Sequence, residues 1–440
     1  MSLRLHLSVP CVRSFSTTAS AFAVKGAKQK QSYKNKNSSG KKRRGPGSNK
    51  YFLDAVSHSN LHKKADAAVL EDLGKLTISE DGTLAFGSLV RYPSHILKTL
   101  YRFGSFQKTQ FNEIHPEPLS VIRESTTGKL WDFLNSSVET SSKSNRLIIT
   151  GDSGVGKSTA IAQFQALSKT KGSVVIPFTN LDSLLDGSSD FVFDQTSQKY
   201  SQPMANAKLL KKVRTGNEEE LKEIKLENQD LSAWKTGDVT PETSLYEFLQ
   251  LARSQKLKWN SGAVLEFAVK VLSEQVKYPV YLTVDNLSAF PKTPFTAYRN
   301  TSNEPLYFGD FQLASLITDL ASGFRSFKKG GVVMATSGIH GEFDQTIPAV
   351  CGLVKPDPYS TQFQFDDVFA KKLVSNGGVK HLAVENLTLE ESEVLVNFLV
   401  DSQVIPEEDG DLTRLAQAKY FLSGNGNPLA LYKSCVLAYM

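Results

Sequence analysis

Cysteine is scarce in this chain of 440 residues, and the three that occur, Cys11, Cys351 and Cys435, are far apart. No C-x-x-C pair is present, so the sequence offers neither the disulfide framework of a small secreted domain nor a thiolate zinc site. His58 and His62 are four residues apart, as two metal ligands on a helix would be. No third ligand is nearby, so a solvated helix face explains them better.

Long hydrophobic runs are also missing. No apolar stretch approaches the roughly 18 residues that cross a bilayer, so the sequence predicts no membrane span. With 40% hydrophobic and 22% charged residues, the chain is able to bury a sizeable core, and we expect more than one structural unit.

Acidic residues are absent from the first 53 positions, which contain twelve Lys or Arg. Subtracting these twelve from the net charge of +6 leaves −6 for residues 54–440. Residues 1–24 combine arginine, serine and threonine with leucines, which is typical of a mitochondrial presequence and predicts import into the matrix. Residues 25–50 carry ten positive charges among Gly, Ser, Asn and Gln and predict a disordered arm. RNA phosphate is the usual partner of such a run, and a solubilising tail is the alternative.

The most informative stretch is residues 146–159, RLIITGDSGVGKST. A short apolar run, typical of a buried parallel strand, leads into a full G-x-x-x-x-G-K-[ST] motif. We expect the following residues to bind phosphate: Gly151, Asp152, Ser153, Gly154, Val155, Gly156, Lys157, Ser158 and Thr159. The Gly-Asp-Ser-Gly fragment also occurs around serine-protease nucleophiles, but the Gly-Lys-Ser that follows fits phosphate binding far better.

Each residue type in this loop has a chemical reason. The glycines let successive backbone N–H groups converge on phosphate oxygens. Lys157 brings a point charge to the β- and γ-phosphates, and the Ser158 hydroxyl is a ligand for Mg²⁺. The helix expected over residues 158–169 adds the positive end of its dipole.

A second apolar strand, residues 278–285, ends in Asp285, as a Walker B strand requires for holding Mg²⁺ opposite Ser158. In hydrolytic proteins of the AAA+ type a glutamate follows this aspartate, whereas here the next residue is Asn286. An amide is no general base, so we expect slow or absent hydrolysis unless a carboxylate arrives from elsewhere. We therefore assign no catalytic residue.

Three further stretches complete the predicted site. Residues 119–134 have helical spacing and precede the P-loop strand, where a helix would close one side of a base pocket. Residues 330–337 form a buried strand that ends in Ser337, suited to the γ-phosphate. Near the end of the chain, Gly426, Asn427 and Pro428 open a last apolar helix. No Asn-Lys-x-Asp motif follows a strand, so the motifs do not choose between adenine and guanine.

The chain resembles the death-associated protein 3 family and looks like a fungal member of it. The resemblance rests on the presequence, basic arm, Walker A loop, Asp285-Asn286 pair and terminal Gly-x-Pro helix taken together. Members of this family are GTP-binding proteins of the mitochondrial small ribosomal subunit, and the resemblance covers roughly residues 90–440. It implies an AAA+-like fold, bound GTP or GDP with Mg²⁺, rRNA and ribosomal-protein partners, and a position near intersubunit contacts. Carried onto this sequence, it implies Mg²⁺ on Ser158 and Asp285, Ser337 near the γ-phosphate, and Asn427 and Pro428 near the base.

The expected fold class is α/β: a P-loop NTPase of AAA+/STAND type with a parallel sheet, a small helical, winged-helix-like C-terminal subdomain and a basic N-terminal arm. The expected organisation is presequence 1–24, basic arm 25–50, N-terminal extension 51–118, NTPase domain 119–380 and C-terminal subdomain 381–440. Within the NTPase domain, residues 183–240 read as a polar, solvated excursion.

Three functions compete. The first is a structural protein of the mitochondrial small ribosomal subunit that uses GTP or GDP as a folding cofactor. The second is a matrix AAA+ ATPase or chaperone, which would use ATP and needs a catalytic carboxylate and a neighbour's arginine. The third is a STAND-like switch, which would want an effector domain. We favour the first, because Asn286 speaks against turnover.

Overall fold

A computed structural model describes residues 72–78, 84–106, 117–227, 229–234, 239–254, 260–338, 344–402, 404–405 and 411–437. The expected presequence, the basic arm and most of the N-terminal extension lie outside these residues. All the described elements belong to one compact unit that spans residues 49–440.

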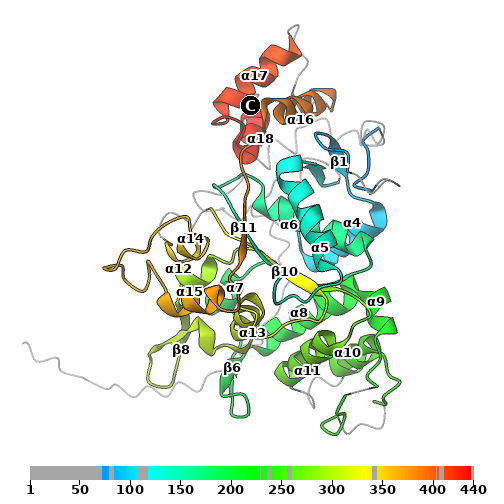
Figure 1. Cartoon of the computed structure of the whole chain (residues 1–440), viewed down its shortest axis with the longest axis vertical. Coiled ribbons are helices and arrows are strands. Elements are labelled where there is room, and N and C mark those ends of the chain that lie inside the picture. The colour runs from blue at the N-terminus through cyan, green and yellow to red at the C-terminus, as the bar shows by residue number, and fades with distance from the viewer. Residues whose placement is uncertain are drawn as a thin grey trace, which may run out of the picture. The chain divides into compact units, whose positions relative to one another are not determined.

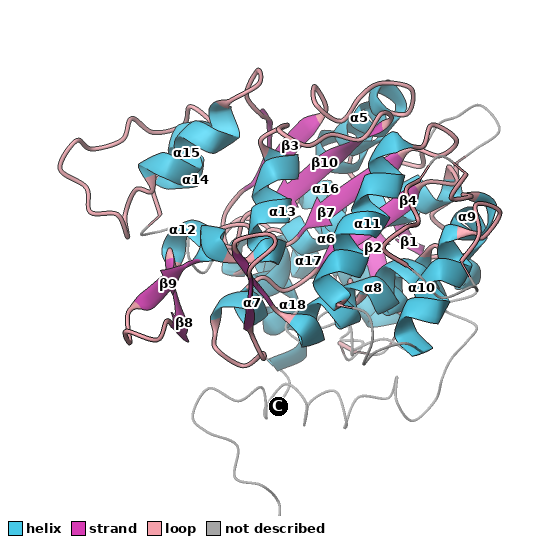
Figure 2. Cartoon of the chain, turned by 90° about the horizontal axis from the view of Figure 1, so that it is seen from below, coloured by secondary structure: helices cyan, strands magenta, loops and turns pink. Residues whose placement is uncertain are grey.

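A parallel five-stranded sheet lies at the centre of the described chain (Figure 2). Its strands are β3 Arg146–Thr150, β4 Val174–Phe178, β7 Val280–Val284, β10 Gly330–Ala335 and β11 Lys380–Ala383. They are ordered β11-β3-β10-β7-β4, so β10 separates the P-loop strand from the strand that precedes Asp285. Because the strands are parallel, all five carboxyl ends meet at one edge, where ligands of open α/β sheets bind.

Helices cover both faces of this sheet, as a buried parallel sheet requires. Ile148 of β3 enters one hydrophobic cluster, and its neighbours Leu147 and Ile149 enter a second, so the strand alternates between two cores. The first core is built with α8 Pro203–Gly216, α10 Leu245–Ser254, α11 Ser261–Glu274, α13 Gln312–Ala321 and α15 Asp367–Val374. The second is built with α4 Ser94–Phe103, α5 Lys129–Ser137 and α6 Lys157–Thr170 (Figure 1).

The segment 183–240 is not the solvated excursion that its composition suggests. It contributes α8 and α9 Glu218–Glu223 to the first core, where Leu209, Val213 and Leu221 are almost completely buried. Several of the charged residues, such as Lys208, Lys211 and Glu219, are exposed on these helices, so a polar composition conceals an apolar stripe.

The C-terminal part consists of α16 Leu389–Asp401, α17 Leu412–Leu422 and α18 Pro428–Leu437. A capping box between Thr388 and Glu391 fixes the start of α16. The three helices form a third cluster that includes Leu89 and is flanked by Val121 from the β1–β2 ribbon. The boundary expected between residues 380 and 381 is wrong, because it falls inside β11, which pairs with β3. In residues 384–402, 404–405 and 411–437 no strand accompanies the helices. The expected winged-helix-like subdomain therefore has no β-wing in these residues.

Smaller elements complete the described chain. The two-stranded ribbons are β1 Leu89–Arg91 with β2 Leu119–Val121, β5 Val192–Asp194 with β6 Lys199–Ser201, and β8 Phe295–Arg299 with β9 Pro305–Tyr307. Short helical segments are η2 Glu124–Gly128, α7 Asp182–Leu185, α12 Ala289–Lys292, η3 Phe308–Asp310 and α14 Thr346–Val350. The helix expected over 119–134 is therefore a strand, a π-turn and a shorter helix. None of the helices in the described ranges has the length and apolarity to span a bilayer.

Candidate functional site

The Walker A stretch lies between the end of β3 and the start of α6, with Lys157 buried inside the loop at 6% exposure. Its Nζ donates to the carbonyl oxygens of Gly151 at 2.6 Å and Asp152 at 2.5 Å. Burial lowers the pKa of Lys157 to about 8, while the carboxylates of Asp152 and Asp285 act in the opposite direction. A cation held this way is stabilised by an incoming anion, which is what a phosphate-binding loop needs.

The two expected Mg²⁺ ligands lie next to each other. The hydroxyl of Ser158 hydrogen-bonds to the carboxylate of Asp285, although the two residues come from α6 and from the end of β7. Burial raises the pKa of Asp285, and the Ser158 hydrogen bond and the Lys157 charge oppose that effect. A hydroxyl beside a buried carboxylate is an oxygen donor set suited to Mg²⁺. Among the described residues no group of three or more His, Cys, Asp or Glu is placed to hold a metal ion.

A carboxylate also lies beside the residue that replaces the expected glutamate. The Nδ2 of Asn286 donates to Oδ2 of Asp182 at 2.6 Å, and Asp182 is exposed at the start of α7. Asn286 has a left-handed backbone, with φ of 63°, and its Oδ1 is buried without a hydrogen-bond partner in the described structure. Asp182 follows β4, the strand next to β7, so the sheet order brings the two side chains together.

Ser337 lies just beyond β10, at the same edge of the sheet. Its backbone N–H donates to Oγ of Ser288 at 3.3 Å. The following residue, Gly338, lies directly against the backbone of Ser153 with no room for a side chain. The end of β10 and the P-loop are therefore adjacent, as a γ-phosphate contact from Ser337 would require.

The C-terminal helices contact the P-loop directly. Asn427 donates through Nδ2 to the carbonyl oxygen of Ser153 at 2.8 Å, and the N–H of Leu429 donates to the carbonyl of Gly154 at 3.2 Å. Gly154 has φ of 85°, and a Cβ there would meet Asn427 and Leu429 at 2.7 Å. Only glycine therefore allows this approach, and the phosphate loop forms part of the junction between the NTPase core and the C-terminal part.

Arg123 reinforces the same junction from the other side. Its guanidinium is 8% exposed and donates to Oε2 of Glu391 at 3.0 Å, to the carbonyl of Glu385 at 2.8 Å and to the carbonyl of Asn386 at 2.6 Å. Each of the three guanidinium nitrogens therefore donates one hydrogen bond across the junction, which favours arginine over lysine at this position.

A cavity of about 100 Å³ lies between these elements. It is lined by residues of the β1–β2 ribbon, the P-loop side of α6 and the C-terminal helices, including Val121, Thr126, Thr159, Pro428 and Tyr432. The volume is small for a ligand site and suits one flat ring system better than a whole nucleotide. None of the described residues that line it is an Asp or a Glu.

One polar atom in this cavity lacks a partner. Both ends of the Gln163 amide are paired: its Oε1 accepts from Thr127, and its Nε2 donates to Ser120 and to the carbonyl of Val121. By contrast, Oγ1 of Thr126 is buried without a hydrogen-bond partner in the described structure, and the residue is 3% exposed. An unpaired buried hydroxyl is costly, and a ring nitrogen or exocyclic group would satisfy it.

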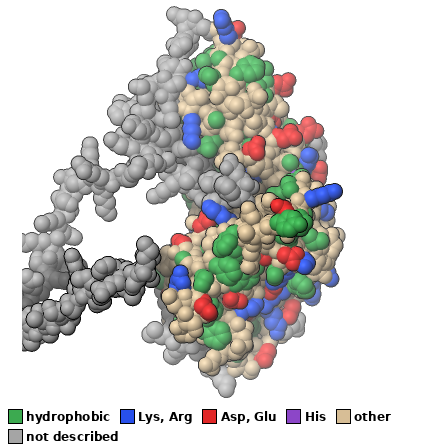
Figure 3. All heavy atoms as spheres, turned by 90° about the vertical axis from the view of Figure 1, so that its left-hand side faces the viewer, with side chains coloured by type: hydrophobic (Ala, Val, Ile, Leu, Met, Phe, Trp, Pro, Cys, Tyr) green, Lys and Arg blue, Asp and Glu red, His purple; other side chains and the backbone are tan. Residues whose placement is uncertain are grey.

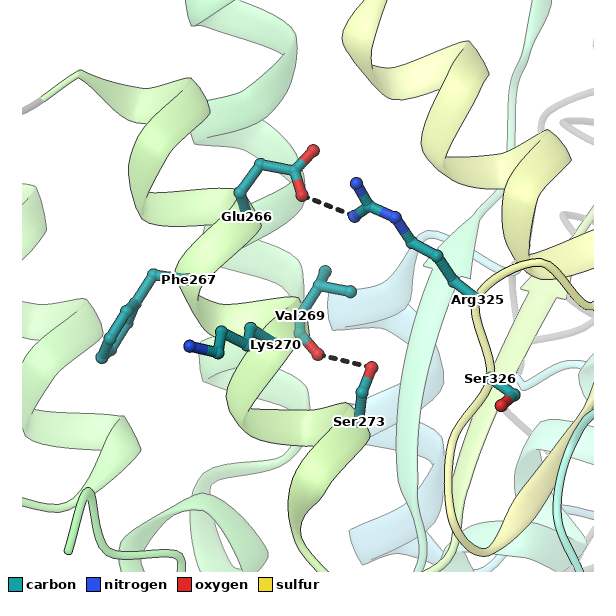
Figure 4. A pocket seen from close by; sticks show the side chains of 7 residues that line it. All are labelled: Glu266, Phe267, Val269, Lys270, Ser273, Arg325 and Ser326. Atoms are coloured by element: carbon teal, nitrogen blue, oxygen red, sulfur yellow. Dashed lines mark hydrogen bonds and ion pairs between the residues drawn. The ribbon is translucent and has the colours of Figure 1, made fainter. Parts of the chain in front are cut away.

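A larger hollow of about 450 Å³ lies elsewhere, between α11 and the loop that follows α13 (Figure 4). Arg325 and Glu266 form an ion pair across it at 2.5 Å, and Ser273 bonds the backbone of its own helix (Figure 4). None of its described lining residues comes from the P-loop or from the C-terminal helices, so it is separate from the Walker A loop.

Residues 120–434 match the family described as mitochondrial ribosomal death-associated protein 3. The chain belongs to this family. Two similar fungal proteins, both called small ribosomal subunit protein mS29, come from Schizosaccharomyces pombe and Neurospora crassa. The first is 25% identical over 79% of this chain and 71% of its own length, and the second is 23% identical over 87% and 80%.

The region matched to the death-associated protein 3 family includes the Walker A residues, Asp285, Ser337 and Asn427. Among solved structures, a Walker-type ATPase of Pyrococcus abyssi is 11% identical with a TM-score of 0.36, covering 76% of this chain and 70% of that one. Cdc6p of Pyrobaculum aerophilum is 10% identical with a TM-score of 0.31, covering 72% and 60%. The α/β assignment stands on the sheet described above.

Sequence reasoning missed three residues of this site: Arg123, Thr126 and Asp182. Arg123 has a local signal, since an arginine directly after the apolar Val121-Ile122 pair is a candidate for burial. Asp182 has none, because only the strand order shows that the end of β4 lies beside the end of β7.

Proposed function

We propose that this chain is a structural protein of the mitochondrial small ribosomal subunit that binds a guanine nucleotide and Mg²⁺ as a stabilising cofactor, with little or no hydrolysis. Membership of a family of mitochondrial ribosomal proteins assigns it to the mitochondrial ribosome and hence to the matrix. The preference for GTP or GDP over ATP comes from the resemblance. Contacts with rRNA and with neighbouring ribosomal proteins belong to the same proposal.

The observation that carries the cofactor proposal is the contact between the C-terminal helices and the phosphate loop, through Asn427 and Leu429. A nucleotide bound at residues 151–159 would touch both parts of this junction. Bound ligand supplies negative charge to the site and thereby compensates Lys157. A ligand that binds only the folded state raises the free energy of unfolding by about 2.7 kcal/mol when its free concentration is a hundred times its Kd.

The absence of rapid turnover is supported by Asn286. Its amide neither accepts a proton from water nor carries charge. In addition, Asn286 hydrogen-bonds the nearby carboxylate of Asp182 and so engages a group that could act as a base.

The test is to identify what the purified chain carries. We expect guanine nucleotide after denaturation, a rise in Tm with GTP or GDP plus Mg²⁺, and loss of both in Lys157→Ala. Lys98→Ala is the matched control, because Lys98 is an exposed lysine on α4, far from the loop in sequence. Tagged chain should sediment with the small subunit in high salt. Nucleotide-free protein whose Tm ignores added nucleotide would contradict the cofactor role.

A second function, nucleoside triphosphatase activity of the AAA+ type, is favoured by Asp182 alone. Its carboxylate lies where the sheet edge brings β4 and β7 together, so it is the candidate base that the Walker B strand lacks. In that case Asp182→Asn removes phosphate release while Tm with nucleotide stays unchanged. Steady release of many phosphates per minute by the wild-type chain would favour this second function over the first.

A further inference from the structure

A groove of about 830 Å³ lies on the side of α8 that faces α10 and the start of α11. It is separate from the nucleotide site, since its lining residues come from residues 203–214, 249–253 and 260–264. Its floor is apolar and includes Ala207, Leu210, Leu249 and Val264, and Met204 at its edge is 51% exposed. Exposed apolar grooves of this kind mark interaction sites in soluble proteins.

Among the described residues that line this groove, every charged side chain is a cation. Lys208, Lys211 and Arg214 come from α8 and Arg253 comes from α10. Arg214 is buried and lies over the ring of Tyr246, 5.6 Å from its centroid. The other three are exposed, and none of them has a carboxylate within ion-pair distance in the part of the chain that the structure describes.

This clustering differs from the face of the molecule shown in Figure 3. On the face shown in Figure 3, acidic and basic side chains are interspersed between small apolar patches. Along the helices around the groove, positive charges occur at 208, 211 and 253 without intervening acids in the lining. A surface with one sign of charge around an apolar floor favours a partner with the opposite sign around an apolar stripe.

The apolar floor distinguishes between the two anionic partners of a ribosomal protein. RNA backbone would place ribose hydroxyls against Ala207, Leu210 and Leu249, which offer no hydrogen bond, and burial of such groups is costly. An amphipathic helix places apolar side chains on the floor and carboxylates beside the cations. A groove between helices is the usual receptor for such a segment.

We propose that the groove between α8, α10 and α11 binds an acidic amphipathic helix of a neighbouring protein. The apolar stripe of that helix packs on Ala207, Leu210 and Leu249, and its carboxylates pair with Lys208, Lys211 and Arg253. This inference rests on the proposed ribosomal role, because it names the chemistry of one protein partner within that role. It is independent of whether nucleotide is bound or hydrolysed.

The test is photo-crosslinking in intact mitochondria from a photoreactive residue at position 207, which is exposed at the groove. We expect an adduct with one protein, mapped by mass spectrometry to a segment with helical apolar spacing and an excess of Asp and Glu. An adduct with rRNA, an adduct with a segment that is not acidic, or no adduct at all overturns the proposal.

Charge reversal gives the second measurement. Lys208→Glu, Lys211→Glu and Arg253→Glu together should lower the adduct yield at least about tenfold, because like charges then face each other. The matched control reverses three exposed lysines that have no ion pair among the described residues, Lys98, Lys129 and Lys143, and should leave the yield unchanged. An undiminished yield in the groove variant also overturns the proposal.

Sedimentation separates this proposal from the ribosomal role. If the wild-type chain is absent from small subunits, the ribosomal role fails, while the mapped adduct still reports on the groove. If the wild-type chain sediments with small subunits but crosslinks to RNA, only the groove proposal fails. The Tm of each purified charge-reversed variant shows whether that variant folds. The crosslink from position 207 without charge reversal tests the proposal independently of those variants.

Discussion

Replacing Arg123 by alanine is expected to loosen the C-terminal helices from the NTPase core. The guanidinium and the Glu391 carboxylate are only 8% and 12% exposed, and the side chain makes three hydrogen bonds to residues 385, 386 and 391. Removal leaves the Glu391 carboxylate and two carbonyl groups without this donor. Breaking a buried ion pair by removing one partner costs about 3–5 kcal/mol, so we expect a loss of that size.

The conservative substitution Arg123→Lys tests how much of the expected stability loss comes from the shape of the guanidinium rather than from its charge. Arg123→Lys keeps the charge but loses the fork that reaches three acceptors from one planar group. With one charged hydrogen bond retained, we expect a loss of about 1–3 kcal/mol. Arg325→Ala is the control, because Arg325 also pairs with a glutamate but is 42% exposed. An exposed pair contributes about 0–1 kcal/mol.

The assay combines urea unfolding with hydrogen exchange of α16–α18. In Arg123→Ala these helices should exchange faster than the central strands, and nucleotide should bind more weakly because its junction is open more often. If Arg123→Ala loses less than about 1 kcal/mol and α16–α18 stay protected, the Arg123 contacts do not hold the junction and the reasoning is refuted.

Two other predictions follow from single side chains. Thr126→Val should leave the free protein as stable as wild type but weaken nucleotide binding about two- to tenfold, the value of one neutral hydrogen bond. Thr126→Ser keeps the hydroxyl and should bind nucleotide normally. Equal affinities of wild type and Thr126→Val in a fluorescent-nucleotide titration would exclude a role for the hydroxyl. Burial raises the pKa of Asp344 from 3.8 to about 6, so its ionisation destabilises the fold as pH rises from about 4 to 6. Asp344→Asn should therefore gain stability relative to wild type over that interval, by up to about 3 kcal/mol above pH 6. The same difference in Tm at pH 4 and pH 7 would contradict this.

Much of the fold was predictable because its signals are local. The strands expected at 278–285 and 330–337 are β7 and β10, and the helix expected after the P-loop, over 158–169, is α6. The errors share one cause. The predictions for 183–240 and 380–383 were based on local composition alone. The packing of these residues depends on distant elements, namely the first hydrophobic core for 183–240 and strand β3 for 380–383.

The sequence alone determined that a Walker A loop lies between a strand and a helix, because the nine residues that form it are contiguous and their backbone requirements are local. Only the tertiary structure decided what surrounds that loop. Asp182 meets Asn286 across 104 residues, Arg123 meets Glu391 across 268, and Asn427 meets Ser153 across 274. Such pairs depend on strand order and helix docking, which are set by burial of the whole chain and leave no mark in the spacing of neighbouring residues.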